Sequence, residues 1–404
     1  MGTIMKKNLI LLWIRDALSG ISGAFGSAAI IQGFLLHAGL SEEKIGIYVT
    51  FGTIVNFIAS LGLSGAASAT NKTVKISSFC FVLTGLVNAA YILPTLIKTN
   101  PSELFILVMA VTGLSSIVLA VKNIFEYKLP CEVINADVYA KYISVSGIVS
   151  GVVGLGCGVL ITFLYRSSDF DKISVIVFLI SSFTIITAGI LNVFLKTLYP
   201  VKNTDKKKQL FGQFKVLFSN RDFRILLLPN FLRGFGAALI SLAAVLAVKT
   251  AGFREEECAV ISSLASAGML ISCAVYLPMI RKCGRALTAF LGAAVFSLVI
   301  PAFLFESRPV FIVLYGIAYV GYNVTCNAIP DLIYRHISAD LISPFQTWRI
   351  AILTLGTTAG TSLFGFMLAR VSPVIILFIG VFGYFVCGTA YYIFYRKMPP
   401  AEKR

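Results

Sequence analysis

Charged side chains are scarce in this sequence, and histidine is almost absent. Only 13% of the 404 residues are charged and two are histidines, whereas 57% are apolar and the mean hydropathy is +0.88. Soluble globular domains are about 25% charged because they present a charged surface to water. The composition therefore excludes a soluble domain and indicates a chain that lies mostly in lipid.

The sequence also lacks the motifs of metal sites and of several enzyme classes. The eight cysteines form no Cys-x-x-Cys pair, and His37 and His336 fall in or beside loops. No Walker sequence Gly-x-x-x-x-Gly-Lys-Ser/Thr occurs, which excludes ATP hydrolysis by that route. His-x-x-x-His, Gly-x-Ser-x-Gly and paired intramembrane aspartates are also missing. We therefore expect no metal, no cofactor, no catalytic residue and no enzyme activity.

Twelve long apolar segments dominate what is present. A helix needs about 20 residues to cross a hydrocarbon core of about 30 Å. The first segment is too long for a secretory signal and is interrupted by Arg15 and Asp16. Pro130 and Pro330 follow the fourth and tenth segments and are expected to end those helices. The sequence predicts an all-α polytopic membrane protein with twelve transmembrane helices. They are expected near residues 9–36, 45–64, 76–97, 104–126, 142–165, 173–195, 225–248, 258–280, 286–305, 310–329, 346–369 and 373–395.

The basic residues behind the net charge of +16 are distributed according to the expected membrane topology. When both termini are placed in the cytoplasm, most lysines and arginines fall on cytoplasmic segments, whereas the acids divide evenly between the two sides. This positive-inside bias indicates orientation in a membrane and not nucleic-acid binding. Lys206, Lys207 and Lys208 are expected in a solvated loop attracted to anionic lipid, with docking of a partner as the alternative. We expect a multi-pass protein of the cell (plasma or inner) membrane.

Three matches between the two halves indicate an internal repeat. A Gly-x-x-Glu-Glu turn occurs at residues 39–43 and again at 252–256, and an Ile-x-Ala-Asp sequence occurs at 134–137 and 337–340. The fifth and eleventh segments carry equivalent glycines, namely Gly147 and Gly151, and Gly356 and Gly360. The matches predict duplication of a six-helix unit. The expected division is residues 1–195, a cytoplasmic linker at 196–224, and residues 225–404 with a short tail.

With this layout the chain resembles the major facilitator superfamily, and the resemblance covers nearly all of residues 6–397. The family signature Gly-x-x-x-Asp-Arg-x-Gly-Arg has a partial second copy here, in which Arg281 replaces the Asp while Lys282, Gly284 and Arg285 fit. The first copy, at residues 68–72, is eroded. The resemblance implies alternating access between two halves, and it assigns Arg281, Lys282 and Arg285 to gating. Loss of the Asp puts the gating salt bridge in question.

The glycine-rich fifth segment has two interpretations. It resembles the corresponding helix of drug antiporters, although Val152 stands where that family has Pro. Alternatively, the small residues let two helices pack closely, which we favour. The glycines concerned are Gly147, Gly151, Gly154, Gly156 and Gly158.

Four cations lie in segments that line the cavity, or flank the lining helices, in the resembling family: Arg15, Lys122, Arg233 and Arg349. They either extend to the cytoplasmic interface or attract an anionic substrate. The acids expected beside them are Glu126, which is four residues after Lys122, and Asp16, which is expected to point away from Arg15. Arg15, Asp16, Lys122 and Glu126 are candidates for coupling or gating. No carboxylate is expected near the middle of a segment, so proton coupling is not established.

Tyrosines and asparagines form a stripe on the tenth segment. The residues Tyr315, Tyr319, Tyr322, Asn323 and Asn327 recur at helical spacing and suit a small organic solute, with helix-to-helix hydrogen bonding as the alternative. Further cavity candidates are Asn56 in the second segment, Asn230 in the seventh, Arg233 and Arg349.

The sequence therefore predicts a secondary active or facilitative transporter of a small organic solute. Because cations outnumber acids among the cavity candidates, a neutral or anionic solute is favoured. The alternatives are an antiporter that exports drugs or toxic compounds and, ranked lower, a sensor or scaffold that has lost transport. We expect a monomer in contact with membrane lipid, with or without a co-transported ion.

Overall fold

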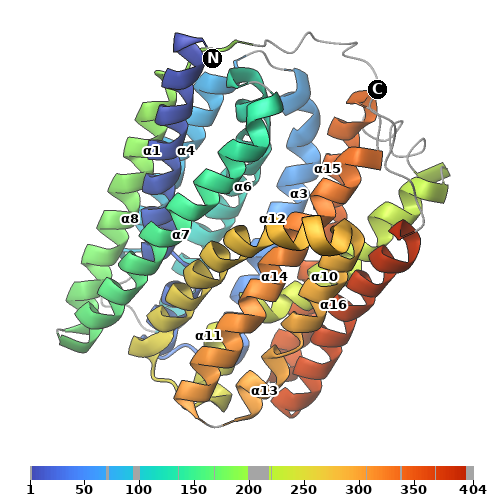
Figure 1. Ribbon diagram of the computed structural model, residues 1–404. Coiled ribbons are helices and arrows are strands. Elements are labelled where there is room, and N and C mark those ends of the chain that lie inside the picture. Colours follow the sequence, from blue (N-terminus) through green and yellow to red (C-terminus); the bar gives the residue numbers. More distant parts are fainter. Residues whose placement is uncertain are drawn as a thin grey trace. The chain divides into compact units, whose positions relative to one another are not determined.

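The computed structural model describes residues 2–69, 72–93, 101–134, 136–167, 169–198, 218–219, 221–305, 307–336, 339–368 and 370–396. Every regular element in these ranges is a helix, and no strand occurs among them (Figure 1). The predicted all-α class is thus confirmed. Most of the linker at 196–224, including Lys206, Lys207 and Lys208, lies outside the described residues.

The chain divides into two compact units. The first comprises Met1–Lys207 and Arg254–Ser266, and the second comprises Lys208–Phe253 and Ala267–Arg404. Residues 254–266 group with the first unit, where the Arg166 guanidinium donates to a carboxylate oxygen of Glu257 at 3.3 Å. The division at 196–224 expected from the sequence stays a prediction.

The described part of the first unit contains seven α-helices. Helix α1 packs against α7 and α8, α4 packs against α6 and α8, and α3 packs against α6. The helices are α1 (Thr3–Phe25), α2 (Ala28–His37), α3 (Glu42–Ala69), α4 (Thr73–Ala90), α6 (Pro101–Val133), α7 (Ala136–Ser167) and α8 (Phe170–Asn192), followed by the short 3-10 helix η1 (Glu255–Glu257).

The second unit repeats this packing. Its first helix, α10, packs against α15 and α16, as α1 packs against α7 and α8. The same pairing of first, fifth and sixth segments in both units agrees with duplication of a six-helix unit. The helices are α10 (Arg221–Ser241), α11 (Ala243–Thr250), α12 (Cys258–Phe296), α13 (Val299–Leu304), α14 (Arg308–His336), α15 (Ala339–Leu368) and α16 (Pro373–Tyr395), with the start of α12 in the first unit.

The first segment of each unit is broken at an equivalent point. In the first unit α1 ends before Gly26, and Ser27 caps α2 by accepting a hydrogen bond from the Ile30 amide at 3.4 Å. In the second unit α10 and α11 meet at Leu242 with a bend of 53°. The breaks are 215 residues apart along the chain (242 minus 27), close to the repeat offset of 213 (252 minus 39). The repeat therefore extends to local backbone geometry.

The membrane segments agree with the sequence prediction. Among the described residues, ten helices are long and apolar enough to cross a membrane, or eleven if the bent pair α10 and α11 counts as one span. One of them, residues 255–304, covers both the eighth and the ninth expected segments. Gly284, with φ 74°, interrupts the helical backbone between those two segments. A layout of twelve crossings is consistent with these helices.

Two expected helix ends are wrong. Pro130 was expected to end a helix, but α6 continues through it to Val133, and the Ile134 amide donates to the Pro130 carbonyl at 2.9 Å. Position 330 likewise lies inside α14. Proline removes one backbone donor and disfavours the preceding turn, but a packed helix tolerates the loss.

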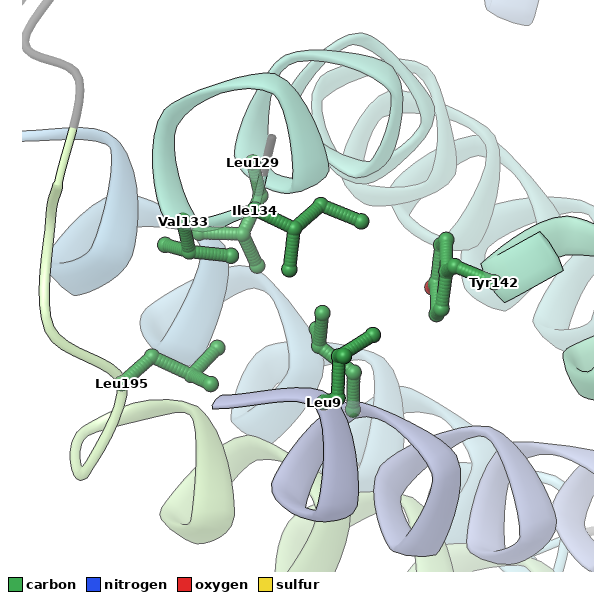
Figure 2. Close-up of a cluster of buried hydrophobic side chains, with 7 residues drawn as sticks. Leu9, Leu129, Val133, Ile134, Tyr142 and Leu195 are labelled. Carbon is green, nitrogen blue, oxygen red and sulfur yellow. The ribbon is translucent and has the colours of Figure 1, made fainter. Parts of the chain in front are cut away.

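Buried apolar side chains close one end of the first unit. Leu9 from α1 meets Leu129 and Val133 from α6, and Tyr142 from α7 lies on the same cluster (Figure 2). The buried Asn8 side chain, at 1% exposure, connects α1 to the end of α6 and to the segment after α8. Its amide donates to the carbonyls of Val133 and Lys196, each at 2.8 Å, and its carbonyl accepts from the Lys196 backbone amide. The cluster holds the start of α1 in place, just before Arg15 and Asp16 on the same helix.

Glycines bring the paired helices into close contact. A Cβ at Gly356 of α15 would lie 2.0 Å from the carbonyl oxygen of Phe231 in α10, and one at Gly234 of α10 would lie 2.0 Å from the Leu353 carbonyl oxygen. In the first unit, Gly20 of α1 meets the Ser150 backbone of α7. In the fifth segment itself, a Cβ at Gly154 or Gly158 would lie 2.6 or 2.2 Å from a serine hydroxyl of α12, which agrees with close packing there, whereas one at Gly156 would meet nothing within 4 Å.

Candidate functional site

Arg15 and Asp16 form the centre of a buried polar network in the first unit. The Arg15 Nε donates to Asp16 Oδ1 at 2.8 Å, and its Nη2 donates to the Tyr142 hydroxyl at 2.9 Å. Asp16 also accepts from the hydroxyls of Tyr142, at 2.8 Å, and Ser146. The expectation that Asp16 points away from Arg15 is wrong, because the long arginine side chain curls back to the neighbouring carboxylate although the two residues leave the helix in different directions.

A second ion pair lies beside this network. The Lys122 ammonium is 3.6 Å from a carboxylate oxygen of Glu126, which confirms the predicted i,i+4 pair. The same ammonium lies 4.6 Å from the centre of the Phe81 ring, and the Arg15 guanidinium lies 5.7 Å from it. Two cations, two carboxylates and one aromatic ring thus form a charge-balanced cluster.

Glu132 is a buried carboxylate that was not predicted from the sequence. Its side chain accepts from the Thr73 hydroxyl at 2.8 Å, and the residue is 2% exposed. It was missed because Pro130 was expected to end the helix, which placed Glu132 in a loop. The position of Pro130 inside α6 brings this carboxylate into the unit.

Arg233 has a different environment, in the second unit. It is 5% exposed, and its Nη1 is buried without a hydrogen-bond partner among the described residues. Its electrostatic neighbours are Tyr322 and Cys326 on α14 and Tyr384 and Cys387 on α16. No carboxylate is among these neighbours, so the charge of Arg233 is not balanced in the way that the charge of Arg15 is.

A row of aromatic rings leads to this arginine. The ring centres of Tyr315 and Tyr319 are 6.0 Å apart, those of Tyr319 and Tyr322 are 5.5 Å apart, and those of Tyr322 and Tyr384 are 5.7 Å apart. Phe296 packs on Tyr384 with ring centres 4.4 Å apart. The stripe predicted on the tenth segment is therefore a contiguous set of rings, extended by two residues from other helices.

The asparagines of that stripe bond to the protein itself. The Asn323 amide donates to the Tyr319 carbonyl one turn earlier, at 3.0 Å, and the Asn327 backbone carbonyl accepts from the Tyr276 hydroxyl at 3.1 Å. The Asn323 bond stays within α14 and the Asn327 contact uses the backbone, so helix-to-helix bonding by these amide side chains stays a prediction. The tyrosines remain the stronger candidates for contact with a solute.

Asn230 and Arg349 lie near the same region of the second unit. The buried Asn230 amide donates to the Tyr391 hydroxyl at 2.7 Å. Both Arg233 and Arg349 act electrostatically on Tyr391, and Arg349 is also only 5% exposed. Helices α10, α15 and α16 therefore place two buried arginines around one phenol.

The remaining candidates lie elsewhere. Asn56, in the first unit, donates to the Ser116 carbonyl at 3.3 Å and so joins α3 to α6. Arg281 and Lys282 are exposed beside Gly284, whose positive φ fits the glycine of the predicted signature turn. Of the first signature copy, at residues 68–72, positions 70 and 71 lie outside the described part. Within that part, no three residues of the kinds that ligate metals come together.

Comparison with known proteins places the fold. No protein-family model matches the sequence, and a search of curated proteins finds no match either. Solved structures do match over nearly the whole chain. A D-xylose–proton symporter is 14% identical with a TM-score of 0.72 and covers 99% of each chain. The nucleoside transporter NupG is 13% identical with a TM-score of 0.65, and the match covers 98% of this chain and 100% of that one.

A third match is a bacterial homologue of the iron transporter ferroportin, 14% identical with a TM-score of 0.68 over 96% of this chain and 99% of that one. The chain therefore has the fold of the major facilitator superfamily, as the sequence resemblance implied, and is a multi-pass membrane protein. At identities this low the matches show the fold alone, while the names of these three proteins refer to three different kinds of solute.

Proposed function

We propose that this protein is a secondary active or facilitative transporter of a small organic solute, working by rocker-switch alternating access. The observation that carries the proposal is the fold, which matches transporters over nearly the whole chain. In transporters of this build, solutes bind near the midplane between two repeats. We propose residues 1–195 and 225–404 as the two moving halves, with 196–224 as the linker.

The charges of the two units favour a neutral or anionic solute. Asp16, Glu126 and Glu132 are each held by cations or hydroxyls of the first unit. A cationic drug would compete with these partners for the carboxylates, whereas an anion would find an unbalanced guanidinium at Arg233. Export of drugs or toxic compounds is the alternative, and a sensor or scaffold without transport is ranked below it.

Asp16 and Glu126 are the candidates for coupling to an ion, together with Arg15 and Lys122. A change in the charge of Asp16 would act on three donors at once, so protonation there would alter the contact between α1 and α7. Proton coupling is not established, and exchange and facilitated diffusion stay open. Arg281, Lys282 and Arg285 are proposed for gating because they occupy the turn at Gly284.

We further propose a monomer in the cell membrane, with both termini cytoplasmic, in contact with lipid, and without enzyme activity, metal or cofactor. Reconstitution in liposomes tests the function. Labelled sugars, carboxylates, phosphorylated solutes and dyes are screened with and without a pH gradient. Uptake of a neutral or anionic solute above empty liposomes supports the proposal. Transport of cationic dyes alone, abolished by Asp16→Asn, would establish the efflux alternative instead.

A further inference from the structure

The buried cations of the two units differ in how their charge is balanced. In the first unit, Arg15 has Asp16 as a hydrogen-bonded counter-ion, and Lys122 has Glu126. In the second unit, Arg233 is as deeply buried as Arg15, at 5% against 4% exposure, but none of the electrostatic neighbours that the structure describes for it is a carboxylate. The asymmetry is specific, because both arginines lie on the first long helix of their unit.

A guanidinium cannot relieve its burial by losing a proton, because its intrinsic pKa is too high. Removing a cation from water without a partner carries a large free-energy cost, so buried charges in proteins are paired or bind ligands. Within the described ranges the Nη1 atoms of Arg15 and Arg233 are both buried without an acceptor, but only Arg233 also lacks a carboxylate among its described neighbours. An anion that arrives from outside the chain would supply both the acceptor and the missing charge.

The surroundings indicate what kind of anion fits. Tyr322 and Tyr384 flank Arg233, and Phe296 and Tyr319 continue the aromatic surface through ring contacts of 4.4 to 5.9 Å. Such rings bind the apolar body of an organic molecule and exclude water from it, which strengthens a nearby ion pair. A small, fully hydrated inorganic anion gains nothing from the rings.

We propose that Arg233 binds the carboxylate of an organic anion whose apolar or aromatic body lies on Tyr322 and Tyr384. The proposal rests on the proposed transport function, since it names the class of solute that this site accepts. A carboxylate can accept two parallel N–H donors from one guanidinium, which gives orientation as well as affinity. Arg349, the second arginine that acts on Tyr391, adds positive potential in the same region.

Thermal unfolding of the full-length protein in detergent tests binding without requiring transport. The probes are benzoate and hexanoate, with benzyl alcohol as the neutral counterpart of benzoate and with chloride and phosphate at equal ionic strength. Binding to the folded state raises the Tm with ligand concentration. We expect a rise of a few degrees with the two carboxylates, no rise with benzyl alcohol, and smaller effects of the inorganic anions.

Three variants assign the effect to the site. Arg233→Met removes the charge while keeping an unbranched side chain, and the carboxylate effect should disappear. Arg370→Met is the control, because Arg370 is an exposed arginine of the same unit and also contacts a ring, that of Phe366 at 3.8 Å. This control should retain the effect in full, and Arg233→Lys should retain part of it.

Three results would overturn the proposal: no rise in Tm with either carboxylate, an equal rise with chloride, or a carboxylate effect that survives Arg233→Met. Failure here is distinguishable from failure of the transport function. If liposomes take up a neutral solute equally well with wild type and Arg233→Met, transport stands and the anion site is wrong. If carboxylates bind through Arg233 but no solute crosses the membrane, the site stands and the transport function is wrong.

Discussion

Replacing Arg15 and Arg233 by methionine should shift stability in opposite directions. Both side chains are almost fully buried, and methionine keeps much of the apolar stem of arginine in each case. Arg15→Met leaves the Asp16 carboxylate without its cation, although Tyr142 and Ser146 still donate to it. Arg233→Met instead removes a cation that has no counter-ion among its described neighbours. The same chemical change therefore breaks a pair at one position and relieves an unbalanced charge at the other.

The magnitudes follow from the pairing. Removing one partner of a buried ion pair costs about 3–5 kcal/mol. The two remaining hydroxyl donors reduce this for Asp16, since hydrogen bonds to charged groups contribute about 1.5–3 kcal/mol each, so we expect Arg15→Met to destabilise by about 2–4 kcal/mol. Replacing a whole buried ion pair by apolar residues is neutral or stabilises by about 1–4 kcal/mol. Since Arg233→Met removes a buried charge without breaking a described pair, we expect it to stabilise the ligand-free protein by about 1–2 kcal/mol.

Unfolding in detergent, followed by tryptophan fluorescence or by binding of a thiol-reactive dye, measures both shifts. The double variant Arg15→Met with Asp16→Leu removes the whole pair and should recover most of the stability lost in Arg15→Met. A similar loss of stability in Arg15→Met and Arg233→Met would refute the reasoning, because it would mean that Arg233 has a counter-ion in the folded protein. A double variant no more stable than Arg15→Met would refute the assignment of Asp16 as the partner.

Two further predictions concern packing in the second unit. Gly356→Ala places a Cβ 2.0 Å from a carbonyl oxygen of α10, so α15 must move, and we expect the free energy of unfolding to fall by about 1–3 kcal/mol. Gly156→Ala is the control and should be almost neutral, because a Cβ there meets nothing within 4 Å. Equal effects of the two substitutions would contradict the close contact between α10 and α15. Tyr391→Phe removes the acceptor of the buried Asn230 amide and should lower the free energy of unfolding by about 1–2 kcal/mol. Tyr392→Phe is the control and should change stability little. A larger loss in Tyr392→Phe than in Tyr391→Phe would show that this hydrogen bond does not stabilise the packing of α10 on α16.

The fold could be predicted from the sequence because its main signals are local. Apolar length marks each membrane segment, and the turn at residues 39–43 recurs at 252–256, which revealed the repeat. Pro130 led to a wrong helix end, since proline disfavours helix in isolation but tertiary packing carries α6 through it to Val133. The error hid Glu132, which lies beyond that proline.

The site was predictable only in part. Helical spacing alone placed Tyr315, Tyr319 and Tyr322 on one side of α14, and their rings do follow one another. The contribution of Tyr384 depends on how α16 packs, which the sequence does not show. Similarly, Arg15 and Arg233 look equivalent as arginines in apolar segments. Only the three-dimensional structure shows that Arg15 has a counter-ion and that Arg233 has none among the neighbours that the structure describes.

Solute counterflow in liposomes tests the central claim most directly, because a carrier that alternates between two sides exchanges labelled for unlabelled solute. Liposomes with wild type, Arg233→Met or Arg370→Met are preloaded with unlabelled benzoate or hexanoate, and entry of the labelled compound is followed. We expect transient accumulation of label with wild type and Arg370→Met and its loss with Arg233→Met. Accumulation that is unchanged in Arg233→Met, or that occurs only with cationic dyes, would contradict the claim.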